Sequence, residues 1–94
     1  MNTFTATIER FDMKGGWHYV PVPPELYLPL RHRAVHFGFM AITARVGNSS
    51  WQTSILPKGD GSYFIALPAK IRTKEKLFLG NEVEVSFEER TRDS

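Results

Sequence analysis

The sequence predicts an all-β fold, a six-stranded split β-barrel with two short helices. Short apolar segments recur between clusters of turn residues, which is typical of small barrels and sandwiches. The first and last of these segments alternate apolar and polar residues, as half-buried strands do. A chain of 94 residues can bury one modest core. We therefore predict a single domain over residues 1–90 and a frayed C-terminal tail at 91–94.

The N-terminal half predicts three strands and one short helix. Alternation in FTATI, residues 4–8, predicts the first strand. A turn at Gly15 and Gly16 leads into the strand WHYVPV, which ends at prolines because proline cannot donate to a β-ladder. The segment PELYL is long enough for one helical turn, which we expect Pro29 to end. The apolar run VHFGFMAITARV, residues 35–46, predicts a strand buried on both faces.

The C-terminal half predicts three further strands and a second helix. The turn GNS precedes the strand SWQTSIL, and the turn KGDG lies between that strand and the strand YFIAL. Pro68 ends that strand, and a short helix is predicted over residues 70–77. We expect Gly80 to end this helix in a left-handed conformation. The last strand, NEVEVSFEE, turns its apolar residues inward and its glutamates toward solvent.

The predicted core contains nine apolar residues from the last four strands. They are Val35, Phe37, Phe39, Ile55, Ile65, Leu67, Val83, Val85 and Phe87.

A weak internal echo predicts that the domain is a repeat with pseudo-twofold symmetry. YVPVPPEL (residues 19–26) aligns with FIALPAKI (residues 64–71), which places Pro23 on Pro68. Each segment is a strand, a proline and the start of a short helix, followed by another strand. Chance similarity between two apolar strands that end in proline is the alternative interpretation.

Composition excludes several classes of protein. The chain has no cysteine, which excludes a disulfide framework, a thiolate metal site and a thiol nucleophile. Its N-terminal residues alternate polar and apolar types, unlike a signal peptide or a membrane span, so we expect a cytoplasmic protein without a membrane partner. The net charge of +2 favours neither binding nor exclusion of nucleic acid.

The sequence lacks the motifs that mark common catalytic and cofactor sites. GxSxG, HExxH and phosphate-loop patterns are absent, and we expect neither an enzyme nor a cofactor. His32 and His36 are four residues apart, which on a helix would suit a metal ion. Pro29 and the strand predicted from residue 35 interrupt such a helix, so no metal site is predicted.

Two functions remain open, and both use Arg72, which the second helix is expected to present beside the barrel mouth. In the first, a small non-catalytic ligand-binding or accessory module takes an anionic or aromatic ligand with Trp17, Arg45 and Arg72. In the second, a DNA-binding regulator uses basic residues beside the two helices, which are Arg31, Arg33, Lys70, Arg72 and Lys74. These charges are also those of an ordinary solvated helix surface. Arg72 itself is expected to cap carbonyls that the terminated strand leaves unpaired or to contact a ligand. The chain is expected to be a monomer or a weak dimer.

Three stretches of the chain together carry a family resemblance. GGWHYVPVPPEL, ARVGNSSWQTSILPKGDGSYFIALPAKIR and LGNEVEVSFEE resemble a bacterial family of small split β-barrels, the domain of unknown function DUF1905. The resemblance spans residues 4–89 and implies a fold but no activity, because the family has none assigned. Gly80-Asn81 stands where members generally have Gly-Asp, and Gly47-Asn48-Ser49 where they usually have Asn-Gly. Both departures keep turn chemistry.

The second half of the chain carries a shorter resemblance. YFIALPAKIR and LGNEVEV are similar to swapped-hairpin transcription factors, which include antitoxins and transition-state regulators. Those domains dimerise and grip DNA with arginines. The resemblance implies that two such halves in one chain would replace the dimer.

Overall fold

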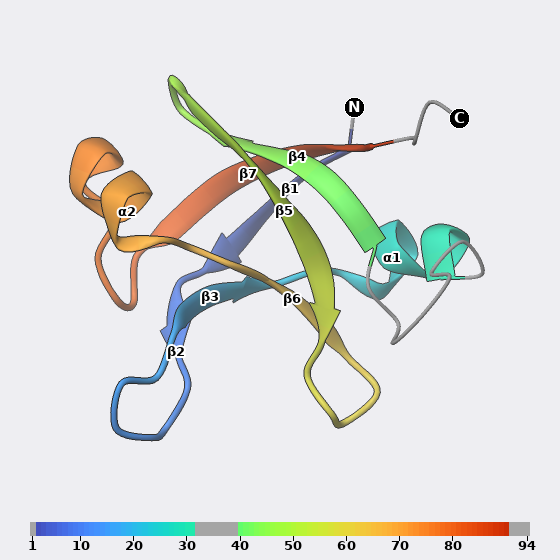
Figure 1. Ribbon diagram of the computed structural model, residues 1–94, viewed down its shortest axis with the longest axis horizontal. Helices are drawn as coiled ribbons and strands as arrows, with labels where there is room; N and C mark the ends of the chain where they lie inside the picture. Colours follow the sequence, from blue (N-terminus) through green and yellow to red (C-terminus); the bar gives the residue numbers. More distant parts are fainter. Residues whose placement is uncertain (1, 32–39, 91–94) are drawn as a thin grey trace.

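The computed structural model describes residues 2–31 and 40–90, which form seven strands and two short helices around one core (Figure 1). The strands are β1 (Asn2–Thr7), β2 (Glu9–Arg10), β3 (His18–Pro21), β4 (Met40–Val46), β5 (Ser49–Pro57), β6 (Tyr63–Ala66) and β7 (Glu82–Glu89). The helices are α1 (Pro24–Arg31) and α2 (Ala69–Glu75).

The sheet curls into a nearly closed antiparallel barrel. Its strand order is β1-β7-β4-β5-β6-β3-β2, so the two outermost strands, β1 and β2, are consecutive in the chain. Only Ile8 separates them; its N–H donates to the carbonyl of Asn81, and its carbonyl accepts from the N–H of Gly80. The predicted all-β fold is confirmed, with seven strands instead of six. The first predicted strand is divided at Ile8 because its first part pairs with β7 and its second part with β3.

The barrel interior contains the predicted core wherever the structure describes it. Ile55, Ile65 and Val85 are fully buried, and Phe4 meets Phe87 edge to face at 6.3 Å between ring centroids. The other predicted core residues within the described ranges, Leu67 and Val83, are also buried. Val35, Phe37 and Phe39 lie outside the described residues.

The pairing of β3 with β6 has the pseudo-twofold symmetry that the internal echo predicts. Val20 pairs with Ile65, and these two residues are equivalent in the alignment, so the axis passes between them. Two hydrogen bonds beyond the ladder are exchanged by the same axis. The N–H of Val22 donates to the carbonyl of Tyr63 at 3.0 Å. In the equivalent bond, the N–H of Leu67 donates to the carbonyl of His18 at 2.9 Å.

The symmetry extends to the rest of the sheet and to the helices. Strand β4 pairs with both β5 and β7, and the β4–β5 ladder corresponds to the β7–β1 ladder. Helix α1 begins directly after Pro23, and α2 begins directly after Pro68. The prediction that these prolines occupy equivalent places is confirmed.

The two helices lie at opposite ends of the barrel (Figure 1). Ile71 of α2 is buried, and Leu26 and Leu77 pack against the core. The prediction that Pro29 ends the first helix is wrong, because α1 continues through it to Arg31. Pro29 is exposed to solvent, where water can satisfy the helix carbonyl that proline deprives of a donor.

The end of α2 also corrects a prediction. The helix ends at Glu75, and Lys76 is the left-handed residue that follows it, with φ 55°. Its N–H caps the carbonyls of Arg72 and Thr73. Gly80 does have a positive φ of 89°, but it lies in the turn before β7 and does not terminate the helix. The helix therefore ends with a lysine in the left-handed conformation, at a position where glycine is more usual.

Candidate functional site: a pocket beside the start of α2

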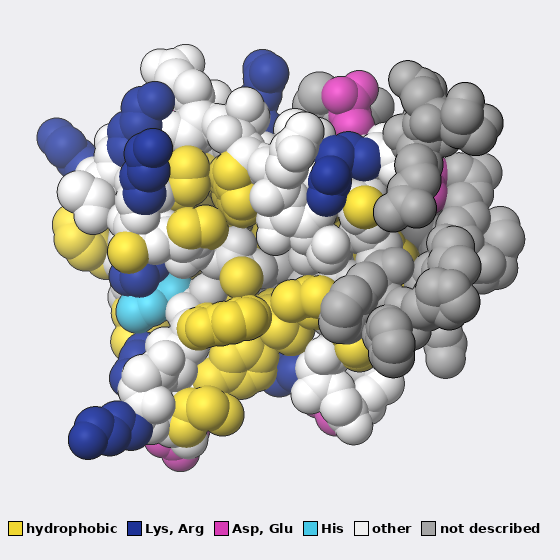
Figure 2. Space-filling model, viewed as in Figure 1, with side chains coloured by type: hydrophobic (Ala, Val, Ile, Leu, Met, Phe, Trp, Pro, Cys, Tyr) yellow, Lys and Arg dark blue, Asp and Glu magenta, His cyan; other side chains and the backbone are white. Residues whose placement is uncertain are grey.

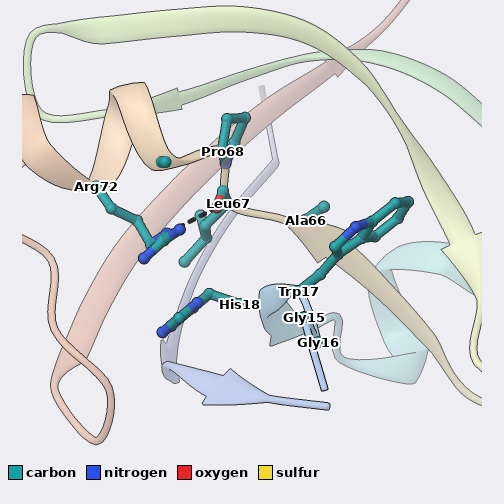
Figure 3. Close-up of a pocket in the computed structure, with 9 residues that line it drawn as sticks. Gly15, Gly16, Trp17, His18, Ala66, Leu67, Pro68 and Arg72 are labelled. Atoms are coloured by element: carbon teal, nitrogen blue, oxygen red, sulfur yellow. Dashed lines mark hydrogen bonds between the residues drawn. The ribbon is translucent and has the colours of Figure 1, made fainter. Parts of the chain in front are cut away.

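A pocket of about 420 Å³ opens to solvent between the loop that precedes β3 and the start of α2 (Figure 3). Trp17 and His18 line it from the loop and β3, and Leu67, Pro68 and Arg72 line it from the segment that links β6 to α2. On this face of the molecule, hydrophobic side chains gather beside a histidine and basic side chains (Figure 2).

Two glycines shape the loop that presents Trp17. Gly15 has φ 73°, which favours glycine, and a Cβ on Gly16 would collide with the carbonyl oxygen of Phe11. The N–H of Phe11 donates to the carbonyl of Trp17 at 3.0 Å and closes the loop. The Gly-Gly pair thus folds the chain back on itself and leaves the Trp17 side chain 58% exposed.

A small aromatic cluster on the outer face of β3 and β6 supports this loop. Phe11 stacks on Tyr19 with ring centroids 4.3 Å apart and meets Phe64 edge to face at 5.0 Å. A second hollow of about 310 Å³, lined by Phe11, Phe64 and Lys58 among others, lies against the same loop and also includes Trp17. Trp17 is therefore shared by two adjoining apolar hollows.

Arg72 is held by the strand end that Pro68 creates. Its Nε donates to the carbonyl of Leu67 at 3.0 Å, which is the tie to an unpaired strand carbonyl that the sequence predicted (Figure 3). Within the described part of the chain, the two terminal guanidinium nitrogens have neither a hydrogen-bond partner nor an ion-pair partner. A guanidinium fixed through one nitrogen keeps its other donors available for a planar anion such as a carboxylate or phosphate.

The electrostatics of the pocket are positive. His18 lies beside Arg72 on one side of the pocket (Figure 3). Burial, followed by the positive charges of Arg72 and Arg10, lowers the pKa of His18 below its ordinary value of 6.5. The imidazole is therefore neutral near pH 7. Without an anion, protonation of His18 costs free energy, because the new charge lies near two arginines. An anion placed beside these groups would be attracted by both arginines.

The structure brings together Trp17 and Arg72, but Arg45 does not line their pocket. Arg45 lies exposed near the C-terminal end of β4, opposite Ser50 on β5 and Ser86 on β7. His18 was missed by the sequence analysis, which considered only His32 and His36, and those as metal ligands. Its position next to Trp17 after the Gly-Gly turn is the signal that points to it.

The residues considered for nucleic-acid binding are divided between the two ends of the barrel. Lys70 and Lys74 are exposed on α2, while Arg31 ends α1 at the opposite end (Figure 1). Arg33 and the side chain of Arg31 lie outside the described residues.

Over residues 2–31 and 40–90, no group of three or more His, Asp or Glu residues could hold a metal ion. His32 and His36 lie outside the described residues. Neither α1 nor α2 is long and apolar enough to cross a membrane.

The fold and the pocket define the class of protein: a small, nearly closed β-barrel with a solvent-open, arginine-bearing hollow where one strand leaves the sheet. The chain belongs to the family described as Domain of unknown function (DUF1905), whose model matches residues 4–87. That match runs from β1 into β7 and confirms the family resemblance. A comparison with curated proteins finds no significant match. The family defines the fold and leaves the function open.

Proposed function

We propose that this domain is a small non-catalytic binding module, and that its ligand carries a carboxylate or phosphate on a flat apolar body. The observation that carries the proposal is the state of Arg72. Its Nε is bonded to the Leu67 carbonyl, and its terminal nitrogens are unpaired among the described residues beside an open pocket. A fixed guanidinium with unused donors is a preorganised anion receptor.

The remaining walls of the pocket suit an apolar body. Ala66, Leu67 and Pro68 form its floor, and Trp17 and Arg72 lie on different sides of these residues (Figure 3). An exposed indole is a frequent ligand contact, since it offers a large rigid face at low entropic cost. An anionic group at Arg72 and a flat apolar group against Trp17 would therefore use both sides of the pocket at once.

The absence of catalytic pairing supports a binding role. The residues that line the pocket include one imidazole and no carboxylate, so a base held by an acidic partner is missing from the lining. We propose that the module acts in the cytoplasm as a monomer or weak dimer.

The proposal is tested by titrating phenyl phosphate and benzoate into the protein and following the backbone amide resonances by NMR. We expect the largest shifts in residues 15–18 and 66–72. Arg72→Met should weaken binding at least tenfold, because charge-assisted hydrogen bonds to the anion are lost. Trp17→Ala should weaken it about three- to tenfold, which corresponds to the usual worth of an aromatic contact of about 0.5–1.5 kcal/mol.

A matched control separates the pocket from general basicity. Lys70→Ala removes an exposed charge from the same helix, outside the pocket lining, and should leave the affinity within about twofold because exposed charges contribute little. Equal losses in Arg72→Met and Lys70→Ala, or shifts that avoid the pocket, would overturn the proposal.

The DNA-binding alternative rests on the exposed Lys70 and Lys74 beside Arg72. It has less support, since α2 has only seven residues and Arg31 ends the helix at the far end of the barrel. A salt titration against mixed duplex DNA decides between the two. A DNA-binding regulator should lose affinity with a slope of about −0.9 per contacted phosphate, and a module for small ligands should show no comparable binding.

A further inference from the structure

A second pocket occupies the position that the pseudo-twofold axis assigns to the partner of the Arg72 pocket. It has a volume of about 540 Å³ and lies beside the start of α1. The pairing of Val20 with Ile65 makes Val22 equivalent to Leu67 and Pro23 equivalent to Pro68. Both members of each pair line their respective pockets.

The two pockets differ at the position that determines charge. Tyr27 takes the place of Arg72 and lines the second pocket. Its hydroxyl donates to the carbonyl of Gly61 at 3.3 Å, and its ring packs against Tyr63 with centroids 4.7 Å apart. An immobilised phenol thus takes the place of the guanidinium, so the two equivalent hollows differ in their chemistry.

The rim of the second pocket is acidic and rich in oxygen acceptors. Glu82 on β7 pairs with Thr7 on β1, and both line the pocket together with Glu9 and Thr5. The described residues that line it include no lysine, arginine or histidine. Pro21, Pro23 and Pro24 form an apolar wall. The lining combines carboxylates and hydroxyls, which accept hydrogen bonds from an ammonium group, with an apolar wall that can pack against an alkyl chain.

We propose that this second pocket binds a small organic cation, an alkylammonium group, with the carboxylate of Glu82 beside the nitrogen and the alkyl chain against the prolines. The Glu9 carboxylate accepts a hydrogen bond from the Tyr19 hydroxyl at 3.5 Å and adds negative charge at the rim. The domain then has two pockets in symmetry-equivalent positions that bind ligands of opposite charge. The pocket at α2 binds anions, and the pocket at α1 binds cations. The proposal does not depend on the function assigned to the Arg72 pocket, because the two sets of lining residues have no member in common.

The test is a titration of n-butylammonium chloride at constant ionic strength, followed by NMR of the backbone amides, with the neutral 1-pentanol as the comparison ligand. We expect n-butylammonium to shift resonances of residues 5–9, 22–27 and 82 and 1-pentanol to shift them little. Glu82→Gln should weaken n-butylammonium binding about two- to fivefold, the effect of about 0.5–1 kcal/mol for one partly solvated charge.

The chain offers a matched control one step along the same strand face. Glu84 faces solvent opposite Thr5 but does not line the pocket, so Glu84→Gln should change the affinity by less than about 1.5-fold. Equal effects of the two substitutions would show non-specific attraction to an acidic strand and would overturn the proposal. Equal shifts with 1-pentanol, or no shifts near Tyr27, would also overturn it. Arg72→Met should leave this binding unchanged, whatever it does to anions.

Discussion

The contact between Gly47 and Glu75 allows a quantitative test of how α2 is held. Gly47 lies in the β4–β5 turn with φ 56°, and a Cβ added there would overlap the Oε1 atom of Glu75. The other carboxylate oxygen, Oε2, accepts a hydrogen bond from the hydroxyl of Ser49 at 2.6 Å. Ser49 is only 3% exposed. The hairpin thus anchors the C-terminal end of the helix that carries Arg72.

Gly47→Ala should destabilise the fold through two separable effects. An L-residue in the left-handed region costs about 1–2 kcal/mol. The new methyl group also forces the Glu75 carboxylate to move, which is the end of a flexible side chain, and weakens its bond to Ser49 by about 0.5–1.5 kcal/mol. The total is about 1.5–3.5 kcal/mol. In a Glu75→Ala background the second effect is already absent, so Gly47→Ala should there cost only about 1–2 kcal/mol.

Urea denaturation monitored by circular dichroism measures the four free energies of unfolding that this double-mutant cycle needs. Gly15→Ala is the matched control, since Gly15 has φ 73° and nothing lies within 4 Å of its added Cβ. It should show the cost of the backbone conformation alone, about 1–2 kcal/mol. The reasoning is refuted if Gly47→Ala costs no more than Gly15→Ala, or if its cost is unchanged when Glu75 is absent.

Four further predictions concern the core, the pocket and a turn. Ile65→Ala should lower the free energy of unfolding by about 2–5 kcal/mol in urea denaturation, because Ile65 is fully buried. Arg72→Ala should lower it by about 1–3 kcal/mol through loss of the bond to the Leu67 carbonyl, and an unchanged value would contradict that tie. Gly80→Val should cost about 1–2 kcal/mol from its positive φ alone, since nothing crowds its Cβ, so an unchanged melting temperature would count against this account. His18 has a folded pKa below its ordinary 6.5, so the unfolded chain binds the proton more readily; stability from this group is present above pH 6.5 and falls as the pH drops through the folded pKa. His18→Gln should flatten that part of the stability-versus-pH curve.

Much of the architecture could be predicted from local patterns, because alternation and proline act on neighbouring residues. The alternating residues of β7 predicted that Val83, Val85 and Phe87 are buried, and all three are. Pro23 and Pro68 predicted where strands end and helices begin, since proline removes a ladder donor and fits the start of a helix. The sequence by itself therefore determined the all-β class, the repeated unit and the burial of the six core residues that it named within the described ranges.

Other features depend on contacts between distant parts of the chain, and only the tertiary structure decided them. The first predicted strand is divided at Ile8 because its first part pairs with β7 and its second part pairs with β3. No local pattern encodes that choice of partner. Lys76 takes the left-handed position that local propensity assigned to Gly80. His18 and Arg72 share a pocket because the β3–β6 register places them beside each other, although 54 positions separate their numbers in the sequence. The opposite charge of the two equivalent pockets likewise arises from side chains on several strands, whose proximity is set by the closure of the barrel and not by their neighbours in the chain.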